Sequence, residues 1–296
     1  MKYIIDTDPG IDDAIAIMMA YLSKLDIIGF TLAEGNANLE QIENNIKTIE
    51  DVLKSDIKIY KSEKSRHTKS DYALYVHGKD GLGDVMADKS QRQTEKISAE
   101  DFIINASKQY EDNLTIICFG PLTNLANAIN KDPEIAKRIT RVVIMGLSYD
   151  PKAKEPYHEF NLKVDPLSAD IVLKSNLKEI LIITHECGIS AYIEKEYIES
   201  LKHSDNEASL FLNKIAKTYI DFSYRSYKVD GLTAPDPLTI ASIINPKIIT
   251  FTPCKVKVDV KEKGLSYTQL VDSSNIKIST AINLKEFQKL FKTIFK

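Results

Sequence analysis

The chain has 296 residues, of which 43 % are hydrophobic and 27 % are charged, a composition typical of a globular protein. Its net charge of −3 gives no electrostatic reason to bind nucleic acid or an anionic membrane, so we expect neither as a partner. The longest apolar run, Ala14 to Leu22, is too short to span a bilayer.

Apolar runs typical of buried strands alternate with helical patterns over the first two thirds of the chain. In chain order, we predict a strand at Lys2–Ile5, a helix opened by Asp12 and Asp13, a strand at Ile27–Leu32, a helix at Leu39–Leu53 and a strand at Ile57–Tyr60. Next come a strand at Leu114–Phe119, a helix at Leu122–Asn130, a strand at Arg141–Met145, a helix after Asp165-Pro166 and a strand at Ile180–Ile183. Apolar strands that alternate with helices indicate a parallel sheet covered on both faces.

The last third of the chain changes character. The predicted elements are helices at about Asn206–Tyr227 and Asp236–Ile244, β-rich segments from Ile248 to Thr280, and a closing amphipathic helix at Glu286–Phe295. No linker composition separates these parts, so we expect a single domain over residues 1–296. The predicted fold class is α/β, with one open, mostly parallel central sheet flanked by helices and a β-rich C-terminal elaboration.

Two features of the chain predict a cytoplasmic protein. Its three cysteines, Cys118, Cys187 and Cys254, are an odd number without metal-type spacing, and Cys118 and Cys187 lie in or beside apolar strand-like runs, so we expect buried free thiols. Asp6 interrupts any apolar segment after the first residues, so we expect no signal peptide. Free thiols without a secretory leader are typical of a reducing compartment.

The most informative feature is a group of four aspartates within eight residues: Asp6, Asp8, Asp12 and Asp13. If the first strand continues to Asp8, then Asp6 and Asp8 project from one side of it, because side chains alternate along a strand. Pro9-Gly10 then breaks the strand. Unpartnered carboxylates this close would repel one another, and hard divalent cations prefer such oxygen ligands. Helix capping accounts for Asp12 or Asp13 but leaves Asp6 and Asp8 unexplained, so we predict a metal or catalytic site.

The segment from Asp6 to Ala14 resembles the N-terminal signature of the nucleoside hydrolases, the inosine-uridine-preferring group. Further motifs match the family in its order up to residue 237. These motifs are Gly35-Asn36, the glycine-rich loop His77–Asp84, Phe119–Ala126, Met145-Gly146, Glu159-Phe160-Asn161 before Asp165-Pro166, and Asp236-Pro237-Leu238. Each motif is short, but their joint agreement in order is highly specific.

The resemblance implies calcium-dependent hydrolysis of the N-glycosidic bond of ribonucleosides, in nucleoside salvage, by a homodimer or homotetramer. It implies that Ca²⁺ is held by Asp8, Asp13, Asp236 and the carbonyl of Phe119, and that Asp8 is the general base. It assigns Asp6 to a supporting position. The residues that it implies for substrate binding are Asp12, Asn36, Glu159 and Asn161 at the ribose, His77 at the base, and Met145.

Three positions depart from the family pattern. Leu147 stands where the family has a glycine, Ala153 where it often has an asparagine, and Pro235 where it usually has a histidine associated with protonation of the leaving base. Because proline cannot give a proton, we predict that His77 or one of the tyrosines near the base pocket, Tyr224 and Tyr227, faces the base. The alternative is that these tyrosines are ordinary packing residues of an amphipathic helix.

Two other functions remain open from the sequence. A strand that ends in Asp-x-Asp also suits a phosphatase of the haloacid-dehalogenase type, although that class accounts for neither Asp12-Asp13 nor the motifs at Glu159 and Asp236. The departures from the family pattern also allow a non-catalytic protein that binds nucleosides or ribose.

Overall fold

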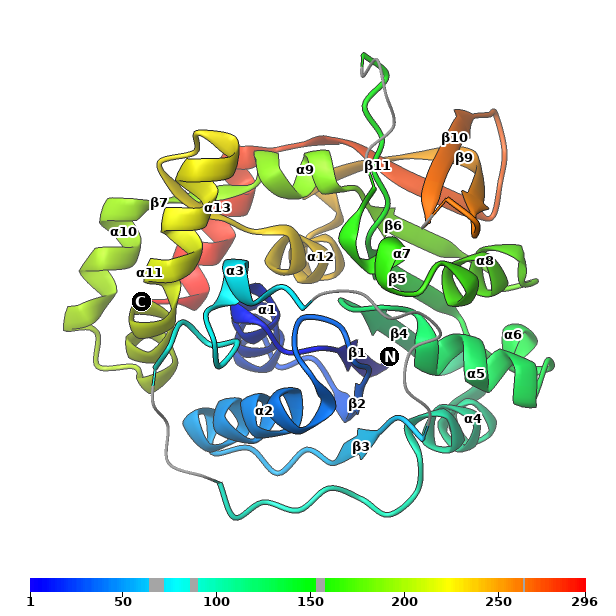
Figure 1. Cartoon of the computed structure of the whole chain (residues 1–296), viewed down its shortest axis with the longest axis horizontal. Helices are drawn as coiled ribbons and strands as arrows, with labels where there is room; N and C mark the ends of the chain where they lie inside the picture. The colour runs from blue at the N-terminus through cyan, green and yellow to red at the C-terminus, as the bar shows by residue number, and fades with distance from the viewer. Residues whose placement is uncertain (64–71, 86–89, 153–157, 263) are drawn as a thin grey trace.

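The fold is built on a nine-stranded sheet with the strand order β10-β9-β11-β6-β5-β4-β1-β2-β3 (Figure 1). The computed structural model describes residues 1–63, 72–85, 90–152, 158–262 and 264–296. The strands are β1 (Lys2–Thr7), β2 (Ile27–Leu32), β3 (Ile59–Lys61), β4 (Leu114–Cys118), β5 (Arg141–Met145), β6 (Ile180–Ile183), β9 (Ile249–Asp259), β10 (Leu265–Leu270) and β11 (Ile276–Ile282). Strands from β3 to β11 in this order pair in parallel, and β9 pairs antiparallel with both β11 and β10. This confirms the predicted, mostly parallel sheet with a β-rich C-terminal elaboration.

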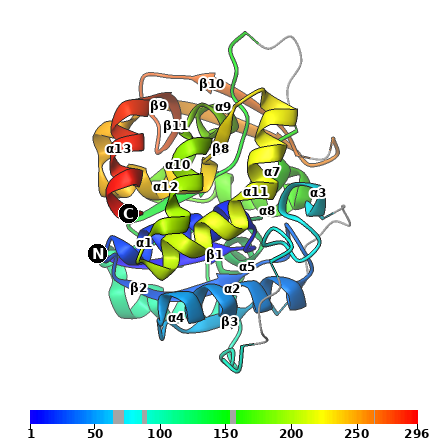
Figure 2. The same cartoon turned by 90° about the vertical axis from the view of Figure 1, so that its left-hand side faces the viewer.

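Helices cover both faces of the sheet, as Figures 1 and 2 show. One face carries α1 (Ile11–Leu22), α2 (Leu39–Leu53), α11 (Glu207–Tyr227), α12 (Pro235–Ile244) and α13 (Leu284–Ile294). The other carries α4 (Ala99–Tyr110), α5 (Thr123–Lys131), α6 (Ile135–Arg138) and α8 (Pro166–Lys174). Ile4 and Ile5, neighbours in β1, are both fully buried and belong to different core clusters. Side chains that alternate along a central strand are therefore buried on both faces, which explains the continuous apolar runs.

Shorter elements connect these layers near the carboxyl ends of the parallel strands. They are α3 (Leu74–His77), α7 (Phe160–Val164), α9 (His185–Ser190), α10 (Lys195–Ser200) and a small antiparallel pair, β7 (Tyr192–Glu194) with β8 (Gly231–Thr233). The predicted long elements lie within a few residues of their observed bounds, but the sequence analysis missed α4 and several short elements, among them α3, α6, α7, α9, α10, β7 and β8. Within the described ranges, we find no helix that combines the length and apolarity needed to cross a membrane.

One buried acid on α2 gives the fold a testable pH dependence. Glu50 is fully buried, and its Oε2 accepts the backbone N–H of Ile57 at 3.0 Å. Burial raises the pKa of this carboxyl to about 7. The pKa of Glu50 in the folded state lies above its value in the unfolded state. The contribution of the neutral carboxyl to the free energy of unfolding is therefore complete below the unfolded pKa and is lost as the pH rises towards about 7.

We therefore expect the stability of Glu50→Gln, relative to that of the wild type, to be about 1–2 kcal/mol greater at pH 8 than at pH 5.5. Glutamine keeps an oxygen that can accept the Ile57 N–H but has no charge to bury. Urea unfolding of both proteins at the two pH values measures the difference. A gap between variant and wild type that is the same at both pH values would contradict the assignment.

Candidate active site

The site begins at the loop between β1 and α1. β1 ends at Thr7, so Asp8 lies in the loop rather than in the strand, and the expected pairing of Asp6 and Asp8 on one side of a continuing strand is wrong. α1 begins at Ile11, which places Asp12 and Asp13 in its first turn. Pro9 contributes to this early break, because proline removes a ladder donor.

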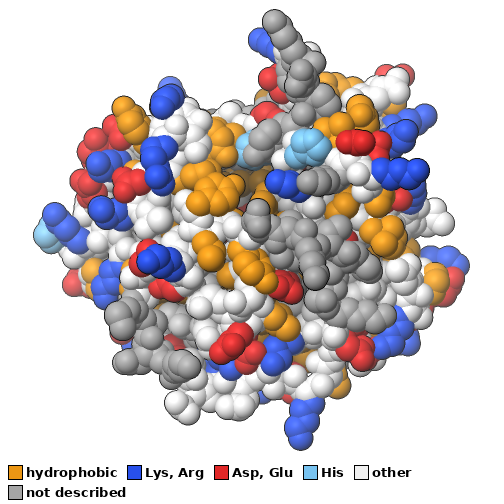
Figure 3. Space-filling view, in the orientation of Figure 1, with side chains coloured by type: hydrophobic (Ala, Val, Ile, Leu, Met, Phe, Trp, Pro, Cys, Tyr) orange, Lys and Arg blue, Asp and Glu red, His pale blue; other side chains and the backbone are white. Residues whose placement is uncertain are grey.

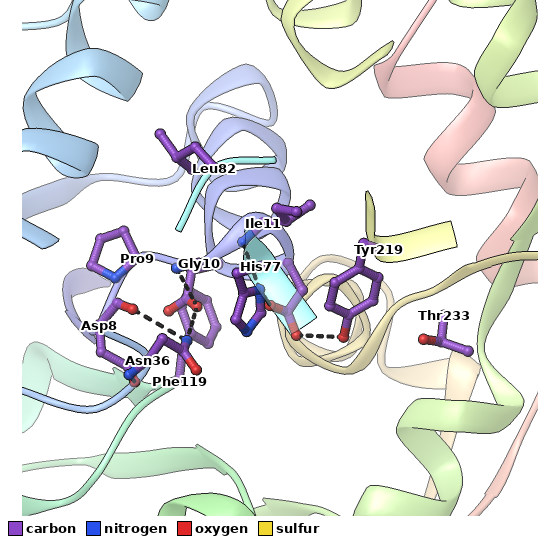
Figure 4. A network of polar contacts seen from close by, with 12 residues as sticks. Asp8, Pro9, Gly10, Ile11, Asn36, His77, Leu82, Phe119, Tyr219 and Thr233 are labelled. Atoms are coloured by element: carbon purple, nitrogen blue, oxygen red, sulfur yellow. Dashed lines mark hydrogen bonds and ion pairs between the residues drawn. The ribbon is translucent and has the colours of Figure 1, made fainter. Parts of the chain in front are cut away.

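Asp13 is held by the loop itself. Its Oδ1 accepts the hydroxyl of Thr7 at 2.6 Å, and its Oδ2 accepts the backbone N–H of Gly10 at 3.0 Å. The second contact is one half of a capping box, so helix capping explains part of this carboxylate's position. The Nδ2 group of Asn36 also donates to Oδ2 of Asp13, at 3.1 Å. Figure 4 shows Asn36 beside this loop.

Asp6 lies beneath the loop. Its Oδ1 accepts the Thr31 hydroxyl at 2.6 Å and the Nδ2 group of Asn124 at 2.7 Å. Burial raises the pKa of Asp6 to about 7, while these two hydrogen bonds lower it. The carboxyl therefore connects β1 to β2 and α5, which is the supporting position expected for it.

Asp8 is fully buried, and two glycines leave the space that its carboxylate occupies. Its Oδ2 accepts the backbone N–H of Asn36 at 2.7 Å, while Oδ1 has no hydrogen-bond partner among the described residues. A Cβ atom placed on Gly35 would lie 2.0 Å from Oδ2, and one on Gly120 would lie 2.3 Å from Oδ1. No side chain fits at either glycine while the Asp8 carboxylate keeps this position.

Asp12, Asp13 and Asp236 form a buried acidic cluster, with one oxygen of each carboxylate within 4.8 Å of the others. Burial raises the pKa of Asp236 well above its usual range, and the charges of Asp12 and Asp13 raise it further. Burial likewise raises the pKa values of Asp12 and Asp13 to about 6. Three such carboxylates ionise together only when a positive charge lies between them.

The cluster differs from the expected ligand set in one member. The expected ligand set has Asp8 with Asp13 and Asp236, and this cluster contains two of those residues together with Asp12. Asp12 projects from the first turn of α1, whereas the Asp8 carboxylate accepts the Asn36 N–H and occupies the space left by the two glycines. Asp12 Oδ1 and Asp8 Oδ1 are both buried without a hydrogen-bond partner in the described part of the chain. Clustered carboxylates with unused oxygens fit a hard divalent cation.

Glu159 and Asn161 lie at the start of α7, next to Phe119. Glu159 caps the helix and accepts the backbone N–H groups of Asn161 and Leu162, each at 3.0 Å. The Nδ2 group of Asn161 donates to the carbonyl oxygens of Phe119 at 2.6 Å and Met145 at 3.2 Å. Glu159 and Asn161 are both buried, as are Phe119 and Met145 beside them. The Glu159–Asn161 segment is therefore not the surface loop that a chance Glu-x-Asn would form.

A central pocket of about 700 Å³, counted to its open mouth, connects these groups. Of the predicted site residues, it is lined by Asp12, Asn36, His77, Phe119, Met145, Glu159, Asn161, Tyr227 and Asp236. Asp8 and Asp13 do not line the pocket and are buried. Figure 3 shows hydrophobic side chains near the middle of the face that is turned towards the viewer in Figure 1.

His77 lies at the inner side of the pocket. Its Nδ1 accepts the backbone N–H of Ile11 at 3.1 Å, and burial lowers its pKa to about 4. The ring is therefore neutral near pH 7, and its proton is on Nε2 because Nδ1 is the acceptor. Figure 4 shows the ring between Ile11 and Tyr219, whose hydroxyl donates to Oδ2 of Asp12 at 2.9 Å.

Tyr224, one of the three residues considered for facing the base, does not line the pocket. Its side chain is 56 % exposed and borders a separate depression together with Asp221 and Arg225. The reason is helical geometry: at about 100° per residue, Tyr224 lies about 140° around α11 from Tyr219 and about 160° from Phe222, and those two side chains form the face that lines the pocket. Tyr224 is turned away from that face.

Among the pocket residues that the sequence analysis missed are Tyr219, Phe222 and His185. The spacing of Tyr219 and Tyr227 was a usable signal for the first. His185 follows the carboxyl end of β6, the edge of a parallel sheet where ligands bind, and that position was its only local signal.

The three departures from the family pattern lie in different surroundings. Leu147 has a φ of +67°, the left-handed region that glycine adopts without strain, and its side chain is buried. Pro235 is the first residue of α12 and lines the pocket against α9, where a Cβ atom on Gly188 would lie 2.7 Å from it. Ala153 lies outside the described residues.

Known proteins share both the sequence pattern and the fold. The sequence profile of the inosine-uridine preferring nucleoside hydrolases matches residues 3–289. Uridine nucleosidase 1 of Arabidopsis thaliana is 30 % identical, over 90 % of this chain and 81 % of its own. The non-specific ribonucleoside hydrolase RihC of Escherichia coli O127:H6 is 29 % identical, over 98 % and 96 %. The solved purine-preferring ribonucleoside hydrolase from Gardnerella vaginalis has a TM-score of 0.92 at 29 % identity and covers all of this chain and 98 % of its own.

Proposed function

Since this chain belongs to the inosine-uridine preferring nucleoside hydrolase family, we propose that it uses a bound Ca²⁺ to hydrolyse the N-glycosidic bond of ribonucleosides, releasing ribose and free base. The hydrolase assignment accords with the names of its relatives. The haloacid-dehalogenase alternative is set aside, because the family profile matches nearly the whole chain. The proposal is carried by the acidic cluster of Asp12, Asp13 and Asp236, which borders a pocket with further buried polar groups.

The residues that would hold the cation are Asp8, Asp13, Asp236 and the carbonyl of Phe119, with Asp12 beside them. All of them offer oxygen, the donor that Ca²⁺ prefers. When bound, the cation supplies positive charge that lets these buried carboxylates ionise together and lowers the pKa of water. The unpartnered oxygens of Asp8 and Asp12 support this assignment.

Asp8 is the proposed general base. Its buried Oδ1 has no hydrogen-bond donor among the described residues and is therefore available to take a proton from the attacking water. As the C1′–N bond breaks, the sugar gains oxocarbenium character, and the nearby carboxylates stabilise its positive charge. Their burial makes this electrostatic stabilisation stronger than it would be in water.

The ribose would be gripped by Asp12, Asn36, Glu159 and Asn161, which all line the pocket. The hydrogen bonds of Asn161 to Phe119 and of Asn36 to Asp8 fix both amides before substrate arrives. Holding the non-reacting hydroxyls orients the anomeric carbon toward Asp8, so binding energy is used at the reacting centre.

A hydrolysis screen with and without a chelator tests the proposal. Inosine, adenosine, guanosine, uridine and cytidine are each incubated with the protein, and release of free base and ribose is measured. We expect turnover of at least one nucleoside, loss of turnover in EDTA and recovery when Ca²⁺ is added. Tight nucleoside binding without turnover would instead establish a binding protein. Full activity in the presence of EDTA would show that the reaction does not need a bound cation.

A second expected result is selectivity for ribose over 2′-deoxyribose. The 2′-hydroxyl meets buried polar groups, and leaving such a group unpaired costs about 1–3 kcal/mol. We therefore expect kcat/KM for uridine to exceed that for 2′-deoxyuridine by about 10- to 100-fold. Equal values for the two substrates would show that the pocket does not grip this hydroxyl.

A further inference from the structure

A continuous series of rings lines the central pocket, which we call the aromatic arc. Neighbouring rings have centroid distances of 5.7 Å, 5.6 Å, 5.9 Å and 5.6 Å, in the order His185, Tyr227, Phe222, Tyr219 and His77. All five residues line the same pocket as the carboxylates of Asp12, Glu159 and Asp236. A nucleoside has a polar sugar and a flat base, so the arc is the surface on which the base packs.

The departing base needs a proton, and this step rests on the proposed nucleoside hydrolysis. A base that leaves as an anion leaves poorly, and a positioned proton donor contributes about 10²–10⁴-fold to such reactions. A donor on the arc lies where the base would pack.

Two polar members of the arc are less suited to supply this proton. His77 accepts the Ile11 N–H through Nδ1 and is neutral near pH 7, so it has no imidazolium proton to transfer. The Tyr219 hydroxyl donates to Asp12. Pro235, which lines the same pocket, has no proton to give.

We propose that His185 donates the proton that the base acquires as it leaves. His185 is the first residue of α9, lines the pocket and is only partly buried, so its ring can recover a proton from solvent. Burial lowers the pKa of its ring, as it does at His77, and the charge of Glu186 opposes this shift. The rings of His185 and Tyr227 meet edge to face, with 70° between their planes. Tyr227 therefore acts as a positioning residue for His185.

The step is balanced in atoms and charge. A proton passes from the His185 ring to a nitrogen or oxygen of the base while the C1′–N electron pair leaves with the base. The water oxygen bonds to C1′, and its proton goes to Asp8. Asp8 then returns this proton to solvent and His185 takes one up, which restores both groups for the next turnover.

The test compares two leaving groups in His185→Gln. Glutamine keeps a polar side chain but cannot deliver a proton from an imidazolium. For the best ribonucleoside substrate, we expect kcat to fall by about 10²–10⁴-fold. For 4-nitrophenyl β-D-ribofuranoside, whose leaving group is stable as an anion, the acid is not needed and we expect kcat to fall only a few-fold.

Two variants and the wild type give the controls. His203→Gln changes an exposed histidine on another segment and should leave both substrates unaffected. Tyr227→Phe keeps the ring that packs on His185 and should lose far less nucleoside turnover than His185→Gln.

Three results would overturn the proposal for His185: equal losses on both substrates, no loss on either, or a nucleoside-specific loss in Tyr227→Phe instead, which would make Tyr227 the donor. Failure of the wild type to hydrolyse any nucleoside would overturn the proposed function, and this proposal with it.

Discussion

Asp8→Asn should lower kcat for ribonucleosides by about 10²–10⁴-fold, the contribution typical of a general base. Asparagine is nearly isosteric with aspartate but cannot accept the proton of the attacking water. Its oxygen can still accept the Asn36 N–H that now binds Oδ2. Steady-state kinetics with the best nucleoside from the screen measures the loss, and thermal unfolding checks that the variant is folded.

Asp6→Asn is the matched control for this prediction. Asp6 is buried two positions earlier in the chain, and its Oδ1 accepts hydrogen bonds from Thr31 and Asn124. Asparagine keeps an oxygen for these donors, so we expect a much smaller loss of kcat. If Asp8→Asn retains more than about a tenth of the wild-type kcat, a loss that a general base should exceed, Asp8 is not the base.

The second large effect is expected from a single methyl group at Gly35 or Gly120. A Cβ atom at these positions would lie 2.0 Å and 2.3 Å from the Asp8 carboxylate oxygens, far inside contact distance. Gly35→Ala or Gly120→Ala must therefore displace the carboxylate, and a misplacement of about 1 Å in a catalytic group can cost about 10²-fold in rate. We expect a loss of kcat of this size in either variant.

Gly146→Ala provides the control, because a Cβ there meets its nearest neighbour, Cδ1 of Leu162, at 3.3 Å. This glycine is also next to the site, at the end of β5, and a small shift of a leucine methyl accommodates the change. Circular dichroism and thermal unfolding establish that each variant is folded. Wild-type kcat in a folded Gly35→Ala protein would show that the position of Asp8 is not critical.

Local pattern determined most of the secondary structure of this protein. The apolar runs at Ile27–Leu32, Arg141–Met145 and Ile180–Ile183 predicted strands whose observed bounds agree, as does the predicted helix at Leu39–Leu53. These patterns are readable because burial on both faces of a parallel sheet demands uninterrupted apolar residues. The aspartates of the first loop were informative for a similar reason, since close carboxylates have few uses apart from binding a cation or doing chemistry.

Tertiary structure decided which side chains meet. Asp236 lies at the start of a helix far along the chain, yet its carboxylate reaches those of Asp12 and Asp13. The space for Asp8 depends on two loops from different strands, which bring Gly35 and Gly120 against its carboxylate. No local pattern encodes such a meeting, because it depends on the order of strands in the sheet.

The same distinction holds for the aromatic arc. The sequence predicted a helix near 206–227, and helical spacing separates Tyr224 from Tyr219, but only packing determines which face of the helix turns towards the pocket. His185 carried no signal beyond its position after a strand, and it joins Tyr227 because α9 packs beside the end of α11. A single sequence records which residues are apolar and how they are spaced. Contacts between distant segments follow from how the layers pack, and in this protein those contacts assemble the pocket.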